Sequence, residues 1–318
     1  MHASPDADAL GSSLGLYHFL KAKGHEVVVV APTEYPNFLN WMAGHEEVLV
    51  FDAKSPEKVS GHFNQAELVF CLDFSGLSRV REMESVLDQS PAKKIIVDHH
   101  LNPEGFADYM IWDTTAAATA ELIYEMIVEM DGRAMVTEDI ASCLYAGIMT
   151  DTGSFKHSNT TPKVHRIVAE LMECGAKSAM ISQAIYDTYS LNRLRFLGYA
   201  LNELLEVNEE MGVAYFAISS SDAQNYQLKK GDTEGLVNYA LSIDGIMVAA
   251  LFKEVDGEIK ISFRSFGDIE VNKFAENYFD GGGHKNAAGG HTFETLKNTV
   301  TTFEKLISQN VLKTKQKG

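Results

Sequence analysis

Apolar residues in the first part of the chain alternate between helical spacing and short unbroken runs. Between residues 9 and 23 one helical face carries Leu10, Leu14, Tyr17 and Leu20, and Gly24 follows, which predicts an amphipathic helix that ends there. Short apolar runs typical of buried strands occupy 27–30, 68–72 and 95–97. Helical patterns return at about 118–130, 137–149, 162–174 and 178–187. This alternation predicts an α/β fold in which helices flank a parallel sheet.

The pattern changes after Asp187. Leucines recur every three or four residues over 189–205, which predicts one continuous helix, and we interpret 188–209 as a helical connector. Beyond it, apolar runs at 213–218, 246–252 and 259–263 alternate with helical patterns near 232–242, 268–279 and 294–308. We therefore predict an α/β domain over 1–187, the connector, and a smaller α/β domain over 210–318.

Composition and charge exclude several classes of protein. With 45% hydrophobic residues the chain is not disordered, and its apolar runs are far shorter than the roughly 18 residues of a membrane span. Lys and Arg number 27 against 44 Asp and Glu, a net charge of −17 that repels long nucleic acids and anionic membranes. Three widely spaced cysteines form no disulfide framework, and the start lacks the apolar run of a secretory signal. We expect a cytoplasmic protein without a membrane partner.

Acidic and histidine residues cluster where the predicted strands and helices end. Asp73 follows the run at 68–72, and the triplet Asp98-His99-His100 follows the run at 95–97. The other members are His2, Asp6 and Asp8 at the start of the chain and Asp151 within residues 147–155. Because parallel strands end at one crevice, these groups should converge. So many carboxylates with imidazoles and no thiolate favour two Mn²⁺ ions, or Mg²⁺, over a structural zinc.

Some of these residues have an alternative, purely structural interpretation. Asp6 and Asp8 are typical capping residues for the helix that begins near Ala9. Asp73 alone is also typical of a turn. The triplet is harder to explain in this way, because three ionisable groups that leave a buried strand are costly to desolvate without partners.

A fifth element lies in the second predicted domain. Residues 281–290 begin with three glycines and continue through His284 and Lys285, so exposed backbone N–H groups there are expected to form an anion-binding nest. Upstream, Arg264 offers a two-pronged donor for phosphate. A glycine run is weak evidence by itself, and a surface ion pair is the alternative for Arg264.

In their order and separations these motifs resemble those of the DHH phosphoesterases with a DHHA1 second domain, a family named for the triplet found here at residues 98–100. The resemblance covers essentially the whole chain. In its length and its glycine run, the chain is most similar to the compact subgroup of bifunctional oligoribonuclease and PAP phosphatase proteins. The resemblance implies a manganese-dependent hydrolase that acts on RNAs of two to five nucleotides and on adenosine 3′,5′-bisphosphate. It also implies a homodimer.

The resemblance also implies that the domain over 1–187 is the catalytic, metal-binding domain and that the domain over 210–318 binds substrate, and it implies roles for single residues. One manganese would be held by His2, Asp6 and Asp73, and the other by Asp8, Asp73, His99 and Asp151. The catalytic residues would be Asp73, Asp98 and His100. Asp98 would orient a neighbouring imidazole, and His100 would reach the phosphate. Substrate would also contact Asn159, Arg264, Ser265, Gly282, Gly283 and His284. Members of the family begin with a strand before the first motif, whereas only Met1 precedes His2 here, so we expect the start to be truncated.

The predicted reaction is hydrolysis of a phosphate ester by a hydroxide that bridges the two ions. Net charge argues against a long nucleic-acid groove or duplex and for small phosphorylated nucleotides. The alternatives within the family are linear or cyclic dinucleotides such as pApA, and pyrophosphate or polyphosphate. A different class is a metal-dependent nucleotide-binding module without catalysis.

Overall fold

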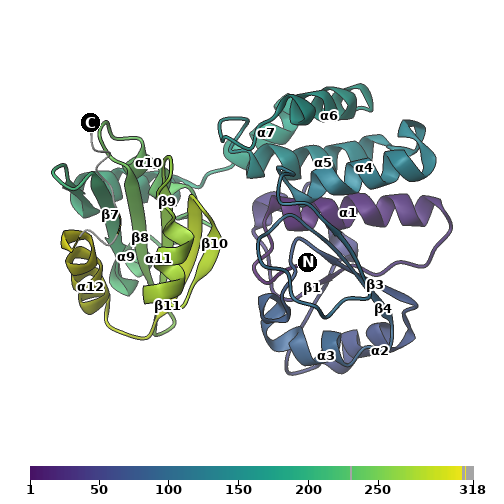
Figure 1. Cartoon of the computed structure of the whole chain (residues 1–318), viewed down its shortest axis with the longest axis horizontal. Helices are drawn as coiled ribbons and strands as arrows, with labels where there is room; N and C mark the ends of the chain where they lie inside the picture. The colour runs from purple at the N-terminus through teal and green to yellow at the C-terminus, as the bar shows by residue number, and fades with distance from the viewer. Residues whose placement is uncertain (230, 310–311, 313–318) are drawn as a thin grey trace. The chain divides into compact units, whose positions relative to one another are not determined.

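The computed structural model describes residues 1–229, 231–309 and 312. The chain divides into two compact units, Met1–Thr188 (unit 1) and Tyr189–Gly318 (unit 2). Each unit has its own sheet structure and helices, as Figure 1 shows, which confirms the predicted α/β class. Among the described helices, none has the length and apolar character that crossing a bilayer requires.

Unit 1 contains the elements that carry most of the predicted chemistry. Its helices are α1 (Ala7–Ala22), α2 (Glu57–Gln65), α3 (Glu84–Asp88), α4 (Thr119–Asp131), α5 (Glu138–Asp151), α6 (Pro162–Glu173) and α7 (Ser178–Tyr186). Its strands are β1 (Val30–Ala31), β2 (Leu49–Val50), β3 (Leu68–Leu72), β4 (Lys93–Asp98) and β5 (Tyr109–Trp112). The predicted helices in 118–187 are confirmed within a few residues, and Thr161 caps α6 with Pro162 in its first turn.

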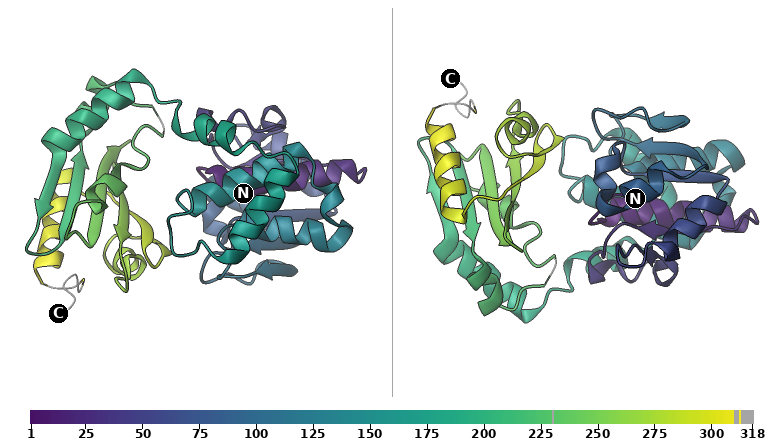
Figure 2. Two further views of the ribbon diagram at one scale, coloured as in Figure 1. Left: turned by 90° about the horizontal axis from the view of Figure 1, so that it is seen from above. Right: turned by 90° about the horizontal axis from the view of Figure 1, so that it is seen from below.

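The strands of unit 1 run parallel, as predicted. β3, β4 and β5 form one parallel sheet, and β1 and β2 form a separate parallel pair. Figures 1 and 2 show α1, α4 and α5 on one side of the sheet and α2 and α3 on the other. Leu72 and Val97 pack toward the first group of helices, and Cys71 and Ile96 toward the second. Side chains therefore bury both faces of β4.

Two predictions for unit 1 are corrected. The first helix, α1, is not amphipathic: every residue from Ala7 to Tyr17 is buried, because α4 and α5 pack on it from one side and the sheet from the other. The run at 27–30 is not a buried strand, since only Val30 of that run is in β1 and Val28 is 40% exposed.

A glycine lets α5 approach α1 closely enough to contact a candidate ligand. A Cβ at Gly147 would lie 2.6 Å from the Asp8 Oδ1 atom and 2.8 Å from the Cβ of Ala120. No side chain fits in that space, so Gly147 permits helices α1, α4 and α5 to meet at Asp8.

Unit 2 is built on one mixed sheet. Its strands are β6 (Leu205–Asn208), β7 (Val213–Ile218), β8 (Val248–Val255), β9 (Glu258–Ser265), β10 (Gly282–His284) and β11 (Ala287–Thr292), in the order β10-β11-β9-β8-β7-β6. Among these six described strands, only β7 and β8 pair in parallel. The helices are α8 (Leu191–Tyr199), α9 (Ser220–Asn225), α10 (Leu236–Leu241), α11 (Val271–Tyr278) and α12 (Leu296–Ser308).

The core of unit 2 is aromatic on one face of its sheet. Phe252 and Phe263 from the strands pack against Phe303 of α12, which runs along the sheet in Figure 2, and against α11. The opposite face packs against α8 and α10.

Two predictions for unit 2 are also corrected. The helix expected over 189–205 is α8 followed by a π-helical turn, Ala200–Leu204, and then strand β6, which pairs with β7. The glycine run is a β-hairpin rather than a nest: β10 pairs with β11, and only Gly283 of its first three glycines has a positive φ. The glycines allow the backbones of the hairpin to approach closely, because a Cβ at Gly281 would lie 2.0 Å from the carbonyl oxygen of Gly289.

Candidate metal centre

The predicted convergence at the carboxyl ends of β3 and β4 is present in unit 1. Asp73 directly follows β3, and Asp98 ends β4. The backbone N–H of Asp73 donates to the carbonyl of Val97 at 3.0 Å, which ties the two strand ends together. Asp73 is 2% exposed and has a φ of 64°, a left-handed conformation that ends the extended backbone of β3.

The first predicted ligand group, His2, Asp6 and Asp73, lies together. The Nε2 atom of His2 is 3.3 Å from an oxygen of Asp73 and 3.8 Å from Oδ2 of Asp6. The other oxygen of Asp6 accepts hydrogen bonds from the backbone N–H groups of Asp8 and Ala9 at the start of α1. Asp6 therefore caps the helix and faces His2 at the same time, so both interpretations of Asp6 are consistent with the structure.

The second predicted group surrounds His99. Its Nε2 atom is 3.3 Å from Asp151, 3.6 Å from Asp73 and 3.9 Å from Asp8. One oxygen of Asp73 faces His2 and the other faces His99, so Asp73 lies between the two groups. This is the arrangement that a bridging ligand requires.

Asp8 does not cap its own helix. Its two carboxylate oxygens accept hydrogen bonds from the backbone N–H groups of Thr119 and Ala120, at 2.7 and 2.9 Å. These groups are the N-terminus of α4, whose own N-cap, Ala118, has no side-chain acceptor. Asp8 is fully buried, and the helix terminus compensates part of its negative charge.

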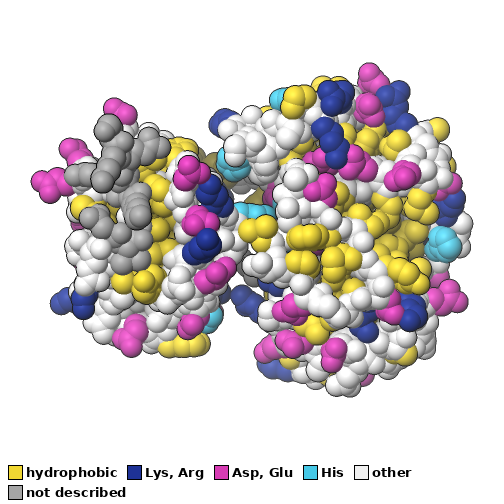
Figure 3. Space-filling view, in the orientation of Figure 1, with side chains coloured by type: hydrophobic (Ala, Val, Ile, Leu, Met, Phe, Trp, Pro, Cys, Tyr) yellow, Lys and Arg dark blue, Asp and Glu magenta, His cyan; other side chains and the backbone are white. Residues whose placement is uncertain are grey.

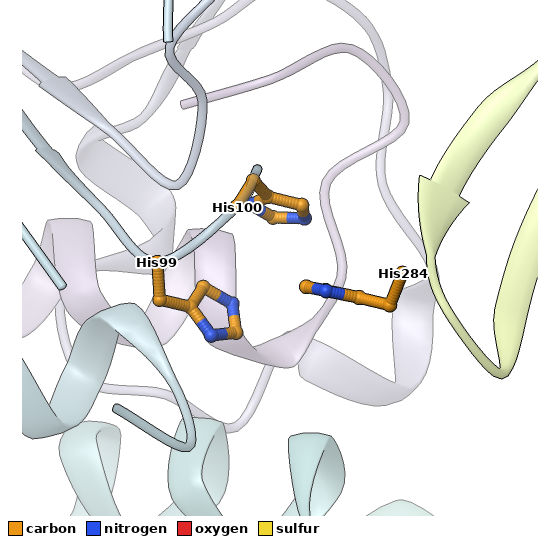
Figure 4. A group of neighbouring side chains, drawn as sticks. All are labelled: His99, His100 and His284. Atoms are coloured by element: carbon orange, nitrogen blue, oxygen red, sulfur yellow. The ribbon is translucent and has the colours of Figure 1, made fainter. Parts of the chain in front are cut away.

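His100 forms a third group with Asp98 and Asp73. Its Nδ1 atom is 2.7 Å from Asp98 and 3.6 Å from Asp73. His99 and His100 directly follow β4, and Figure 4 shows their two imidazole rings next to each other. The side chain of His100 is 23% exposed, against 4% for that of His99, so His100 is the more accessible of the two rings.

The crowding of charges shifts the pKa values of these groups. Burial would raise the pKa of Asp73, but the hydrogen bond from His2 and the other nearby imidazoles hold it well below its usual value. Burial raises the pKa of Asp8 well above its usual value, and Asp73 and Asp151 raise it further. Burial would lower the pKa of His99, but the hydrogen bond to Asp151 and the charges of Asp73 and Asp8 raise it to about 10.

The donor set fits divalent cations. Within the described residues of unit 1, three groups of three residues each place their ligand atoms within 4.8 Å of one another: His2, Asp6 and Asp73; Asp8, Asp73 and His99; and Asp73, Asp98 and His100. Carboxylate oxygens with imidazole nitrogens suit Mn²⁺ or Mg²⁺. Buried carboxylates so close together need compensating positive charge, which protons on the histidines or bound cations can supply.

Asn159 lies beside the centre, on the loop that follows α5. Its amide N–H group donates to the backbone carbonyls of Ala117 and Asp151, at 3.2 and 3.3 Å. It thus links the end of α5 to the turn before α4. Its predicted contact with substrate stays a prediction.

The predicted substrate residues of unit 2 lie on β9 and β10, the two strands that flank β11. Arg264 on β9 is opposite Ala287 of β11, and β11 pairs with β10, which carries Gly282, Gly283 and His284 (drawn in Figure 4). Ser265 is buried, and its hydroxyl donates to the carbonyl of Ile269 and accepts from the Asn286 amide. The phosphate contact predicted for Ser265 also stays a prediction.

Sequence reasoning missed the residues around the start of α4. Thr119 donates a side-chain hydrogen bond to Asp73 at 3.0 Å in addition to its backbone bond to Asp8. The only available signal was a run of small residues, 116–118, at the predicted start of a helix. Such a run permits close approach but does not identify what approaches.

Two family models match successive parts of the chain. The family model described as DHH family, N-terminal domain, matches residues 1–148, and that of the DHHA1 domain matches residues 210–311. Together these matches include every predicted metal ligand except Asp151.

Individual relatives match over almost the full length. The bifunctional oligoribonuclease and PAP phosphatase NrnA of Thermus thermophilus is 31% identical over 91% of this chain and 81% of its own length. The protein of the same name from Bacillus subtilis is 28% identical, covering 92% of this chain and 88% of that protein. The crystal structure of an exopolyphosphatase-related protein from Bacteroides fragilis has a TM-score of 0.92 and 37% identity, over 97% of this chain and 90% of that chain.

Proposed function

The chain belongs to the DHH family of phosphoesterases with a DHHA1 second domain, as its motifs predicted, and we propose that it hydrolyses short oligoribonucleotides and adenosine 3′,5′-bisphosphate. The observation that carries this proposal is the position of Asp73 between two groups of carboxylate and imidazole ligands. Two relatives that match nearly the whole chain are named for the same pair of activities.

We assign two Mn²⁺ ions to the centre, with Mg²⁺ as the substitute. His2, Asp6 and Asp73 would hold one ion, and Asp8, Asp73, His99 and Asp151 would hold the other. When bound, the cations supply an activated water molecule and neutralise negative charge on the phosphoryl oxygens.

The remaining residues of the centre orient and bind. The hydrogen bond between Asp98 and Nδ1 of His100 fixes the orientation of that imidazole. The accessible ring of His100 is placed to contact a phosphoryl oxygen of the substrate. In unit 2 we assign phosphate binding to Arg264, Ser265 and the hairpin residues Gly282, Gly283 and His284, where backbone N–H groups, guanidinium and imidazole are all donors.

Charge supports small substrates. The net charge of −17 opposes tracking along a long backbone, and Lys and Arg side chains are interspersed with Asp and Glu on the face seen in Figure 3. We therefore propose RNAs of two to five nucleotides and phosphorylated nucleotides as substrates, met in the cytoplasm, and no long duplex.

One relative favours a second candidate function. The matching crystal structure from Bacteroides fragilis is described as exopolyphosphatase-related. Inorganic polyphosphate or pyrophosphate is therefore the second candidate substrate class, and the same centre would act on its phosphoanhydride bonds.

A substrate panel tests the proposal. The panel contains pApA, a five-nucleotide RNA, adenosine 3′,5′-bisphosphate, pyrophosphate and polyphosphate, each incubated with Mn²⁺ and with either the protein or its His99→Ala variant. Turnover of the RNA and the bisphosphate by the protein but not by the variant is the expected result. Turnover of pyrophosphate or polyphosphate alone selects the second candidate, and turnover of pApA alone selects dinucleotide hydrolysis. Mn²⁺ binding without turnover of any substrate selects a nucleotide-binding role.

A further inference from the structure

One short segment outside the predicted motifs contacts or is linked to four candidate ligands that come from four different elements. This segment, 116–121, comprises the turn before α4 and the first three residues of that helix, and it is called the α4 turn below. Its residues from Ala116 to Ala120 are at most 4% exposed. It contacts Asp8, Asp73 and His99 directly and reaches Asp151 through Asn159.

The α4 turn orients the ring of His99. The Nδ1 atom of His99 is 3.2 Å from the carbonyl oxygen of Ala116. In a neutral imidazole this contact places the proton on Nδ1, so that Nε2 keeps its lone pair. That Nε2 atom is the one that faces Asp8, Asp73 and Asp151.

Thr119 holds two carboxylates at once. Its backbone N–H donates to Asp8 at 2.7 Å, and its hydroxyl donates to Asp73 at 3.0 Å. Asp8 belongs to α1 and Asp73 follows β3, so the relative position of these ligands depends on one fully buried residue. A hydroxyl that donates to one carboxylate oxygen also restricts which oxygens remain for a cation.

Glu121 fixes the turn itself. Its carboxylate accepts a hydrogen bond from the backbone N–H of Ala117 at 2.7 Å, although the side chain is only 2% exposed. Its other oxygen is 2.9 Å from Lys163 of α6, which also contacts the half-exposed Glu125 at 2.7 Å. A buried carboxylate is costly unless it is paired, so Glu121 and Lys163 brace the turn against α6.

We propose that the α4 turn is the ligand-positioning element of the metal centre and that Thr119 and Glu121 are its positioning residues. This inference rests on the proposed two-ion centre. Neither residue coordinates a cation; each keeps ligand atoms of separate elements at the spacing that a pair of cations needs. Loss of a residue that supports a ligand typically lowers metal affinity by about 10-fold to 100-fold.

Mn²⁺ titration calorimetry on the metal-free full chain tests the role of Thr119. Thr119→Val keeps the shape and the backbone N–H but removes the donor to Asp73, so we expect Mn²⁺ affinity to fall by about 10-fold to 100-fold. Thr119→Ser restores the hydroxyl and should restore the affinity. Thr137→Val is the matched control, because it removes only the cap of α5 and should lower the melting temperature without changing Mn²⁺ affinity.

Glu121→Gln gives a second and independent comparison. It keeps an oxygen near Ala117 but removes the charge that pairs with Lys163, so Mn²⁺ affinity should fall by about tenfold. Glu125→Gln removes the other partner of Lys163 and should leave the affinity unchanged. If Thr119→Val does not fold, this pair of variants decides the question.

The outcomes separate this inference from the proposed function. If the unmodified protein binds two Mn²⁺ ions and folded Thr119→Val binds them with equal affinity, the positioning role is wrong and the metal centre stands. Equal affinities of Glu121→Gln and Glu125→Gln would overturn the role of Glu121 in the same way. If the unmodified protein binds no Mn²⁺, both the centre and its positioning element are wrong.

Discussion

The two units differ in what they bury: unit 1 buries a cluster of ionisable side chains, and unit 2 buries a cluster of aromatic rings. Beneath helices α1, α4 and α5, unit 1 gathers carboxylates and imidazoles that are almost fully buried, with Asp8, Asp73, Asp98 and His99 each at most 4% exposed. Unit 2 gathers aromatic rings, with Phe252 and Phe263 fully buried. An aromatic core lowers the free energy of the folded state by itself, whereas a cluster of like charges does so only with protons or cations. Stability in unit 1 should therefore depend on ligand and pH, and stability in unit 2 should depend on packing.

The strongest test of the difference removes the shared ligand. Asp73→Asn takes away the charge between the two ligand groups, so Mn²⁺-dependent hydrolysis should fall by at least about a thousandfold, more than loss of a supporting residue costs. Steady-state turnover of the short RNA measures the effect. Asp108→Asn, at an exposed ion pair with Lys93, is the control and should retain full activity. Full activity of Asp73→Asn would show that the centre does not act in hydrolysis.

A substitution that creates a cavity in the aromatic core of unit 2 should lower stability without changing Mn²⁺ affinity. Phe263→Ala removes a ring that packs within 6.3 Å, centroid to centroid, of four other phenylalanines, and should lower the free energy of unfolding by about 3–5 kcal/mol. Mn²⁺ affinity should not change. Phe293→Ala, at a 78% exposed ring, is the matched control and should change stability by no more than about 0.5 kcal/mol. Urea unfolding and Mn²⁺ titration of both variants decide this prediction.

Cation addition should stabilise one unit only. At an Mn²⁺ concentration 100 times the dissociation constant, unit 1 should gain about 2.7 kcal/mol, and chelation should reverse the gain. Amide hydrogen exchange on the intact chain resolves the two units separately. Equal protection of β4 in unit 1 and β8 in unit 2 would contradict the comparison.

The smallest expected effect is a pH dependence of the metal-free protein. The pKa of His99 is raised to about 10, so its contribution to stability is complete below about pH 6.5 and is lost as pH rises toward 10. The raised pKa of Asp8 acts in the same direction. In unit 2, burial lowers the pKa of Lys253, which cannot make stability fall as pH rises. Hydrogen exchange at pH 7 and pH 9 should show loss of protection in unit 1 alone, and an equal loss in unit 2 would refute this explanation.

Helices and central strands could be predicted from the sequence because their signals are local. The spacing of apolar residues identified α4 to α7, and Thr161-Pro162 marked the start of α6. The β10–β11 hairpin was missed, because a glycine run permits either an anion-binding turn or close strand packing, and only the pairing of the two strands distinguishes them. Strand β5 was missed because its four residues are all exposed despite being apolar, so they match neither a buried run nor an alternating pattern.

The parts of the candidate site that are formed by side chains could be predicted from the sequence, whereas the parts that are formed by backbone groups could not. Asp73 and the triplet at 98–100 are conspicuous because ionisable residues rarely follow buried strands without a reason. The contacts of the α4 turn are made largely by the carbonyl of Ala116 and by the N–H groups of Thr119 and Ala120. Every residue except proline has both groups, so residue type alone does not reveal their function.

The most direct test of the central claim is anomalous diffraction at the manganese edge from crystals grown with Mn²⁺. The account predicts two anomalous peaks about 3.5–4 Å apart, as in known two-metal sites, with a carboxylate oxygen of Asp73 bound to each. A single peak, or two peaks that do not share Asp73, would contradict it.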